Sequence, residues 1–239
     1  MGTSKGYLPP KGHLWRDAKR AVTNMVNNNF ESNLIGKAVS KYIQATRLGN
    51  GSISANKQQV ISNAGAKAAS FISLAQSKGF NEALNQVGLK HLIGKSNEEI
   101  YMGLLDYFTG NGSSLDEFIV RDSMAELMKE LFLDVTDDKD FGELINELDI
   151  NKFIKDLIIK FVQKDFLANF SEKIEGKCNS IDEYKNAEKN IKDFIRLKID
   201  SCYTVEELSE IDWNGVEGIN FIKSRCSEVL RVFEVYMEG

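Results

Sequence analysis

Hydrophobic residues in the first part of the chain recur every three or four positions, the spacing that places side chains on one face of an α-helix. Residues 14–25 carry one such stripe, and the asparagine run 27–29 interrupts it. A second stripe covers residues 34–43 and ends at the Gly-Asn-Gly sequence 49–51. These patterns predict two amphipathic helices joined by a short turn.

A third helix is expected from about Ala55 to Lys78, because Gly79 is a suitable residue to follow a helix end. Its segment 64–70 (AGAKAAS) consists mainly of small residues. Small side chains allow two helix backbones to approach closely, so we expect another helix to pack tightly against this segment.

Glycines at positions 79, 88 and 94 punctuate the middle of the chain and place a boundary near residue 92. Beyond it, Ser96 and Glu99 have the spacing of a capping box, as do Thr204 and Glu207. The remaining hydrophobic pattern predicts helices over residues 97–108, 114–131, 141–148, 151–174, 181–202 and 218–237.

No segment alternates hydrophobic and polar residues in the way that predicts a strand. The chain has 2 prolines, Pro9 and Pro10, so no proline interrupts the helical region. The expected fold is therefore all-α, a multi-helix globular bundle preceded by a flexible Gly/Pro tail at residues 1–12.

Charge divides the chain into two parts. Residues 1–90 hold 12 Lys/Arg against 3 Asp/Glu, and residues 91–239 hold 18 against 32. We therefore expect a basic helical subdomain at 13–92 and an acidic one at 93–239. The asymmetry indicates two surfaces with different partners, or two halves that attract one another or sister subunits.

The cysteines Cys178, Cys202 and Cys226 are too few, and odd in number, for a disulfide framework. Their even spacing fits no zinc or redox motif, so three separate helix positions are expected. The absence of a signal sequence and of a long apolar segment predicts a cytoplasmic protein without membrane association.

Signatures of catalysis are missing from the sequence. The only histidines are His13 and His91, and neither belongs to a metal-ligand cluster or a nucleophile motif. The acidic segment 134–143 does not have calcium-loop spacing, because Lys139 and Phe141 stand where oxygen ligands belong. We expect no catalytic residues, no metal and no cofactor, with an enzyme of unrecognised type as the remote alternative.

The basic first half raises the possibility of nucleic-acid contact. Arg16, Lys19 and Arg20 fall on the polar side of the first predicted helix. Positive side chains of this kind bind phosphates, although no helix-turn-helix or aromatic-basic motif accompanies them. Lys37, Lys41, Arg47, Lys57 and Lys67 would extend the same surface.

The opening residues Met1-Gly2-Thr3-Ser4 favour removal of Met1, which leaves Gly2 with a free α-amine. The pKa of an α-amine is near 8, roughly two units below that of lysine, so more of it is nucleophilic at neutral pH. Gly6 breaks the myristoylation pattern, which requires Ser or Thr at that position. Another acyl-type modification of Gly2 remains open, and so does an unmodified terminus.

This opening, followed by a Gly/Pro segment, Trp15 and the Ala18–Ala21 helix, resembles the QatB family, the small helical component of the bacterial Qat antiphage system. The resemblance implies an antiviral defence protein that acts with an ATPase, a QueC-like enzyme and a TatD-like nuclease. It further implies that the QueC-like partner attaches a 7-deazaguanine group to Gly2, with Thr3 and Ser4 as recognition residues. The expected role is a non-enzymatic substrate and scaffold; the alternative is a helical nucleic-acid-binding or adaptor protein.

Overall fold

The computed structural model describes residues 12–48, 52–133, 140–201 and 211–236, and these ranges are helices joined by turns, with no strand among them. The all-α prediction is confirmed. The helices, in the order of the chain, are α1 (His13–Asn27), α2 (Ser32–Leu48), α3 (Ser52–Lys78), α4 (Phe80–Gln86), α5 (Asn97–Thr109), α6 (Leu115–Phe132), α7 (Phe141–Asn146), α8 (Ile150–Glu175), α9 (Ile181–Asp200) and α10 (Val216–Arg231), with short 3-10 turns at Lys90–Leu92 and Glu234–Tyr236.

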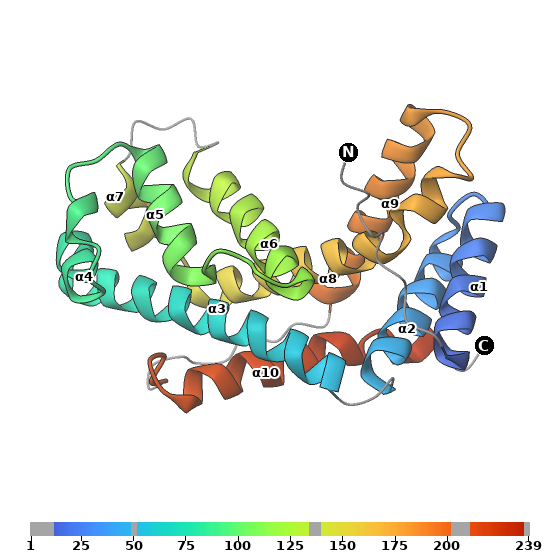
Figure 1. Cartoon of the computed structure of the whole chain (residues 1–239), viewed down its shortest axis with the longest axis horizontal. Coiled ribbons are helices and arrows are strands. Elements are labelled where there is room, and N and C mark those ends of the chain that lie inside the picture. The colour runs from blue at the N-terminus through green and yellow to red at the C-terminus, as the bar shows by residue number, and fades with distance from the viewer. Residues whose placement is uncertain (1–11, 49–51, 134–139, 202–210, 237–239) are drawn as a thin grey trace.

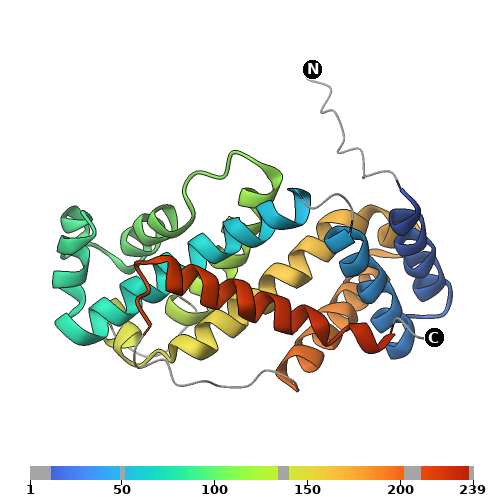
Figure 2. The same cartoon turned by 90° about the horizontal axis from the view of Figure 1, so that it is seen from below.

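Two long helices, α3 and α8, form the spine of the molecule (Figure 1). Helices α4 to α7 gather at one end of this spine, and α1, α2 and α9 gather at the other. Helix α10 lies along the underside of the spine, against both α3 and α8 (Figure 2). Buried side chains from all ten helices belong to one continuous hydrophobic cluster.

Helix α8 is buried on nearly every side, with Ile154, Phe166 and Ile174 fully inaccessible to solvent. A helix in this position is usually apolar all round. Here it also buries Asp156, Lys160 and Asp165, and each of these finds a partner on a neighbouring helix. The centre of the fold is therefore held by charged contacts as well as by apolar packing.

The capping box predicted at Ser96 and Glu99 is confirmed at the start of α5. A second box, Ser114 with Glu117, begins α6. The box predicted at Thr204 lies outside the described residues. The short helix α4 was not predicted, because glycines interrupt the hydrophobic pattern in this stretch. It follows α3 after Gly79, where the backbone has a φ of +91° that favours glycine.

The small segment of α3 receives α10, as its composition predicted. A Cβ atom added to Gly65 would lie 2.8 Å from Cδ1 of Ile222, closer than real Cβ contacts. Glycine at this position leaves room for the end of the Ile222 side chain between the two helices. Among the described residues, no helix is both long and apolar enough to cross a membrane.

Cys178 corrects one prediction. It lies in the turn after α8 and not in a helix, whereas Cys226 lies in α10 as expected, and Cys202 is outside the described residues. Burial raises the pKa of the Cys226 thiol to about 12. Burial, with Glu183 and Glu175 nearby, also raises the pKa of the Cys178 thiol. Neither thiol is activated as a nucleophile at neutral pH.

Candidate functional site

The residues expected to be modified or recognised, Gly2, Thr3 and Ser4, lie outside the described residues. The described chain begins at Gly12, which is exposed and has no heavy atom near its Cβ position. His13, the first residue of α1, is exposed as well. The point at which residues 1–11 join the helical body is therefore on the surface.

Arg16, Lys19 and Arg20 lie on α1, as predicted, but only Arg16 and Arg20 are exposed. Lys19 is half-buried, because α1 packs against α8 next to it. The Trp15 and Phe170 rings meet in this contact, with centroids 6.2 Å apart. Arg20 has a weak ion pair with Asp17, 3.8 Å away, which leaves its side chain 82% exposed.

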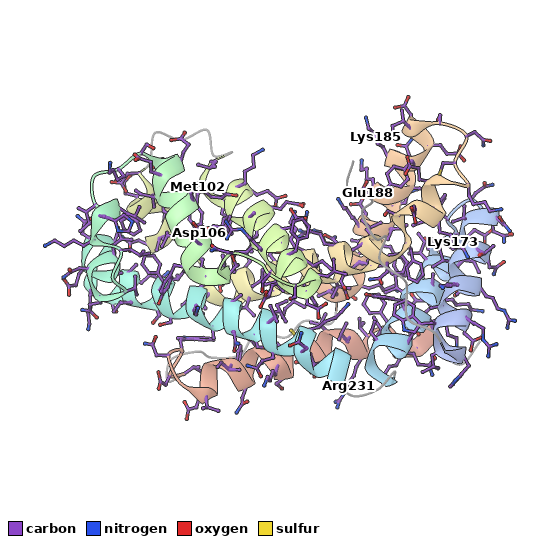
Figure 3. All side chains as sticks on the ribbon, viewed as in Figure 1. Met102, Asp106, Lys173, Lys185, Glu188 and Arg231 are labelled. Carbon is purple, nitrogen blue, oxygen red and sulfur yellow. The ribbon has the colours of Figure 1, made fainter. Side chains whose placement is uncertain are left out.

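The fold adds two lysines to this group that sequence reasoning missed. Lys173, in the last turn of α8, is close enough to Lys19 and to Lys177, in the turn that follows α8, for its charge to interact with both. Figure 3 shows Lys173 at the end of the molecule where α1 lies. Together, Arg16, Lys19, Arg20, Lys173 and Lys177 form what we call the α1–α8 basic surface. Its last two members come from the half of the sequence that is acidic overall, which hid them.

Two other lysines expected on the basic surface contact neighbouring helices, Lys57 largely buried and Lys67 exposed. Lys57 donates to Asp165 Oδ1 at 2.6 Å, and its side chain is only 12% exposed. Lys67 lies over the ring of Tyr107, 5.8 Å from its centroid. The fold therefore removes Lys57 from the expected basic surface, whereas Lys67 stays exposed.

Asp165 is the centre of a buried polar cluster. Tyr42 donates from its hydroxyl to Asp165 Oδ2 at 2.5 Å, Lys57 donates to Oδ1, and Asn169 donates to the Tyr42 hydroxyl at 3.0 Å. A carboxylate, a phenol and an ammonium group together are capable of proton transfer. The adjoining cavity measures about 40 Å³, however, which holds water and excludes a metabolite. This cluster joins α2, α3 and α8 and is structural.

A second charged cluster joins α6 to α8. Lys160 contacts Glu126 and Glu130 at 2.7 and 2.5 Å, and Lys164 contacts Asp122 and Glu126 at 2.6 Å each. Burial raises the pKa of Glu126, but hydrogen bonds from the two lysines outweigh it and lower the pKa to about 2. Glu126 therefore remains ionised and accepts these bonds, which is the behaviour of a structural ion pair.

Two of the hollows on the surface of the described helices are larger than the cavity beside Asp165. One, of about 260 Å³, lies between α6, α8 and α9 and is lined partly by Phe118, whose side chain is 60% exposed. The other, of about 550 Å³, lies between α4 and α7. In the latter, Asp140 caps α7 and Lys78 bonds to Gln86. Within the described ranges, no three metal-ligating side chains gather at a single point.

These features define an all-α protein built around a buried, charged central helix, with a basic surface at one end. A family model described as "Qat anti-phage system associated protein QatB" matches residues 49–233. The match covers more than half of the chain, so the chain belongs to the QatB family and is a component of the Qat anti-phage system. Comparison with curated proteins and with solved structures gave no match.

The family assignment predicted from the N-terminus is thus confirmed by a different part of the chain. The match begins at residue 49, after α1 and α2, and runs through α10. It therefore covers the spine helices α3 and α8 with most of their neighbours. Gly2 and the α1 residues of the basic surface lie outside it, whereas Lys173 and Lys177 lie inside.

Proposed function

We propose that this chain serves the Qat system as a protein substrate and scaffold, and that its Gly2 α-amine is the acceptor of a 7-deazaguanine group. The observation that carries the proposal is membership of the QatB family combined with a sequence that opens Met1-Gly2. The charged clusters of the helical body support a scaffold role, because they join α2 and α6 to the central helix α8.

The chemistry assigned to Gly2 is that of an amine nucleophile. Once Met1 is removed, the neutral fraction of the Gly2 amine exceeds that of a lysine amine at neutral pH, because its pKa is roughly two units lower. Glycine has no side chain to hinder attack. The amine forms a bond to the activated group held by the partner, the leaving group departs from that group, and the amine loses a proton.

The proposed partners are the other components of the system: a QueC-like enzyme that carries out the transfer, an ATPase and a TatD-like nuclease. Thr3 and Ser4 are the proposed recognition residues, because they follow Gly2 directly and would enter the partner's pocket with it. The surface position of Gly12 supports this arrangement, since the preceding residues join the body where a partner has access.

Mass spectrometry after co-expression with the partner genes tests the proposal. The intact mass and the N-terminal peptide should show loss of Met1 and a 7-deazaguanine adduct on Gly2. Gly2→Ala should abolish both the adduct and protection against phage, because the added methyl group hinders the attacking amine.

Lys5→Ala is the matched control and should keep adduct and protection. It removes an amine from the same segment without changing the terminus. A chain that retains Met1, or that stays unmodified beside an active QueC-like partner, would contradict the proposal.

A further inference from the structure

The α1–α8 basic surface is built by the packing of two helices that are distant in the sequence. Trp15 and Phe170 make the apolar contact between them, 6.2 Å between ring centroids. Lys19 follows Trp15 by four residues and Lys173 follows Phe170 by three, so each lysine lies one helical turn beyond the contact and on the same side as its aromatic neighbour. Packing of the rings thereby brings the two ammonium groups together.

The lysines of this surface differ from Lys160 and Lys164 in their contacts with carboxylates. Among the described residues, Lys19, Lys173 and Lys177 form no ion pair, whereas Lys160 and Lys164 on the same helix α8 each have two. Burial lowers the pKa of Lys173, and the charges of Lys19 and Lys177 lower it further. Glu175 acts on Cys178 and Tyr184 toward α9, and Glu172, which directly precedes Lys173, is exposed. Among the described residues, no ion pair neutralises these three lysines.

Arg16 and Arg20 extend the charge outward. They are exposed and four residues apart on α1, about 6 Å along its axis. Together with the three lysines they form a series of cations, which suits a ligand with repeating negative charge. Arginine adds planar groups that bind phosphate oxygens in pairs.

The aromatic residues of this region are beneath the surface and not on it. Trp15 is 7% exposed, Phe170 is 2% exposed and Tyr42 is 2% exposed. Bases of a single strand need exposed rings on which to stack. The region therefore offers contacts to a phosphate backbone and none to base faces.

We infer that the α1–α8 basic surface binds the phosphate backbone of nucleic acid without regard to base sequence. A duplex is the natural ligand, because it presents regularly spaced phosphates with its bases already stacked inside. The site joins α1 to two lysines of the acidic half of the chain. It is independent of the Gly2 amine and of its modification.

Fluorescence anisotropy of the purified, unmodified full chain tests the inference. The probe is a fluorescein-labelled DNA duplex of about two helical turns and mixed sequence. The test variant is K19A/K173M/K177A, in which methionine keeps the packing of the half-buried Lys173 stem. We expect its affinity to fall about tenfold or more at low salt, and its salt slope to fall by about 1 for each phosphate that the variant no longer binds.

The matched control is K90A/K129A/K152A, which removes the same charge from exposed lysines without ion pairs among the described residues. Affinity close to that of the unchanged chain is expected for it, and circular dichroism verifies the fold of both variants. Equal decreases in affinity in the two variants, or no binding by the unchanged chain, would overturn the inference. So would a dimer that only the test variant dissociates, since the surface would then bind a second copy. None of these outcomes alters the N-terminal mass that tests the modification of Gly2.

Discussion

At the scale of single residues, the most consequential feature is that buried charges are paired across helices. Asp165 accepts from Tyr42 and Lys57, which are 123 and 108 residues away in the sequence. Hydrophobic periodicity cannot predict such pairs, because it marks positions as buried without saying which polar groups meet. The sequence suggested a surface role for Lys57, and the fold placed its ammonium group beside Asp165.

Replacement of Asp165 tests this pairing. Asp165→Ala removes the carboxylate that accepts from the Lys57 ammonium and the Tyr42 hydroxyl, and removal of one partner from a buried pair costs about 3 kcal/mol or more. Urea denaturation should show this decrease in the free energy of unfolding. Asp193→Ala, on the exposed face of α9, is the control and should change it by no more than about 0.5 kcal/mol. Similar values for the two variants would mean that the cluster contributes no stability.

The ion pairs of Glu126 predict a specific pH dependence. Its pKa is lowered from 4.5 to about 2 in the folded protein, so the unfolded chain binds more protons between these values. The stabilisation is present above pH 4.5 and is lost as the pH falls toward 2.

Glu126→Gln should therefore flatten the dependence of the unfolding free energy on pH across this interval. Glu98→Gln, an exposed position in the first turn of α5, is the comparison and should keep the dependence of the unchanged protein. A Glu126→Gln variant with the same acid dependence as the unchanged protein would contradict the assigned pKa.

At the scale of elements, the sequence predicted helix ends and the presence of a close helix crossing better than it predicted which helices pack together. The boxes at Ser96 and Ser114 and the end of α3 before Gly79 follow from local backbone chemistry, which adjacent residues decide. The partners of each helix do not follow from it. The small residues of α3 indicated a close neighbour, and only the fold identified α10.

Gly218, in the first turn of α10, gives a test at this scale. A Cβ atom added there would lie 2.8 Å from Cα and 2.9 Å from O of Trp213, and backbone atoms cannot move away as a side chain can. Gly218→Ala should lower the free energy of unfolding by about 1–3 kcal/mol despite the better helix propensity of alanine.

Asn190→Ala in α9 is the control for Gly218→Ala, since it introduces alanine at an exposed helical position. It should be neutral or slightly stabilising. A stabilising effect of Gly218→Ala would contradict the close contact between Gly218 and the backbone of Trp213.

At the scale of the whole molecule, one hydrophobic cluster includes residues on both sides of the proposed boundary at 92/93. One tryptophan lies on each side of this boundary, Trp15 in α1 and Trp213 directly before α10. Both are buried. The division into a basic and an acidic subdomain remains a proposal about charge. Whether each part folds by itself is a question of cooperativity.

Single-tryptophan variants answer that question. In Trp15→Phe and in Trp213→Phe, the remaining tryptophan should lose its folded fluorescence at the same urea concentration at which circular dichroism reports loss of helix. This follows if the shared core makes unfolding a single transition. Separate fluorescence and helix transitions would show that residues 13–92 and 93–239 unfold as independent units.

The sequence by itself determined the helical class, most helix boundaries, the family and the candidate amine at Gly2, because these depend on neighbouring residues and on short motifs. The tertiary structure decided which charges meet. Packing largely buries Lys57, pairs Lys160 and Lys164 with the acids of α6, and places Lys19 near Lys173. Contacts between residues on different helices, thirty or more positions apart, depend on the packing of whole helices, which no local pattern encodes.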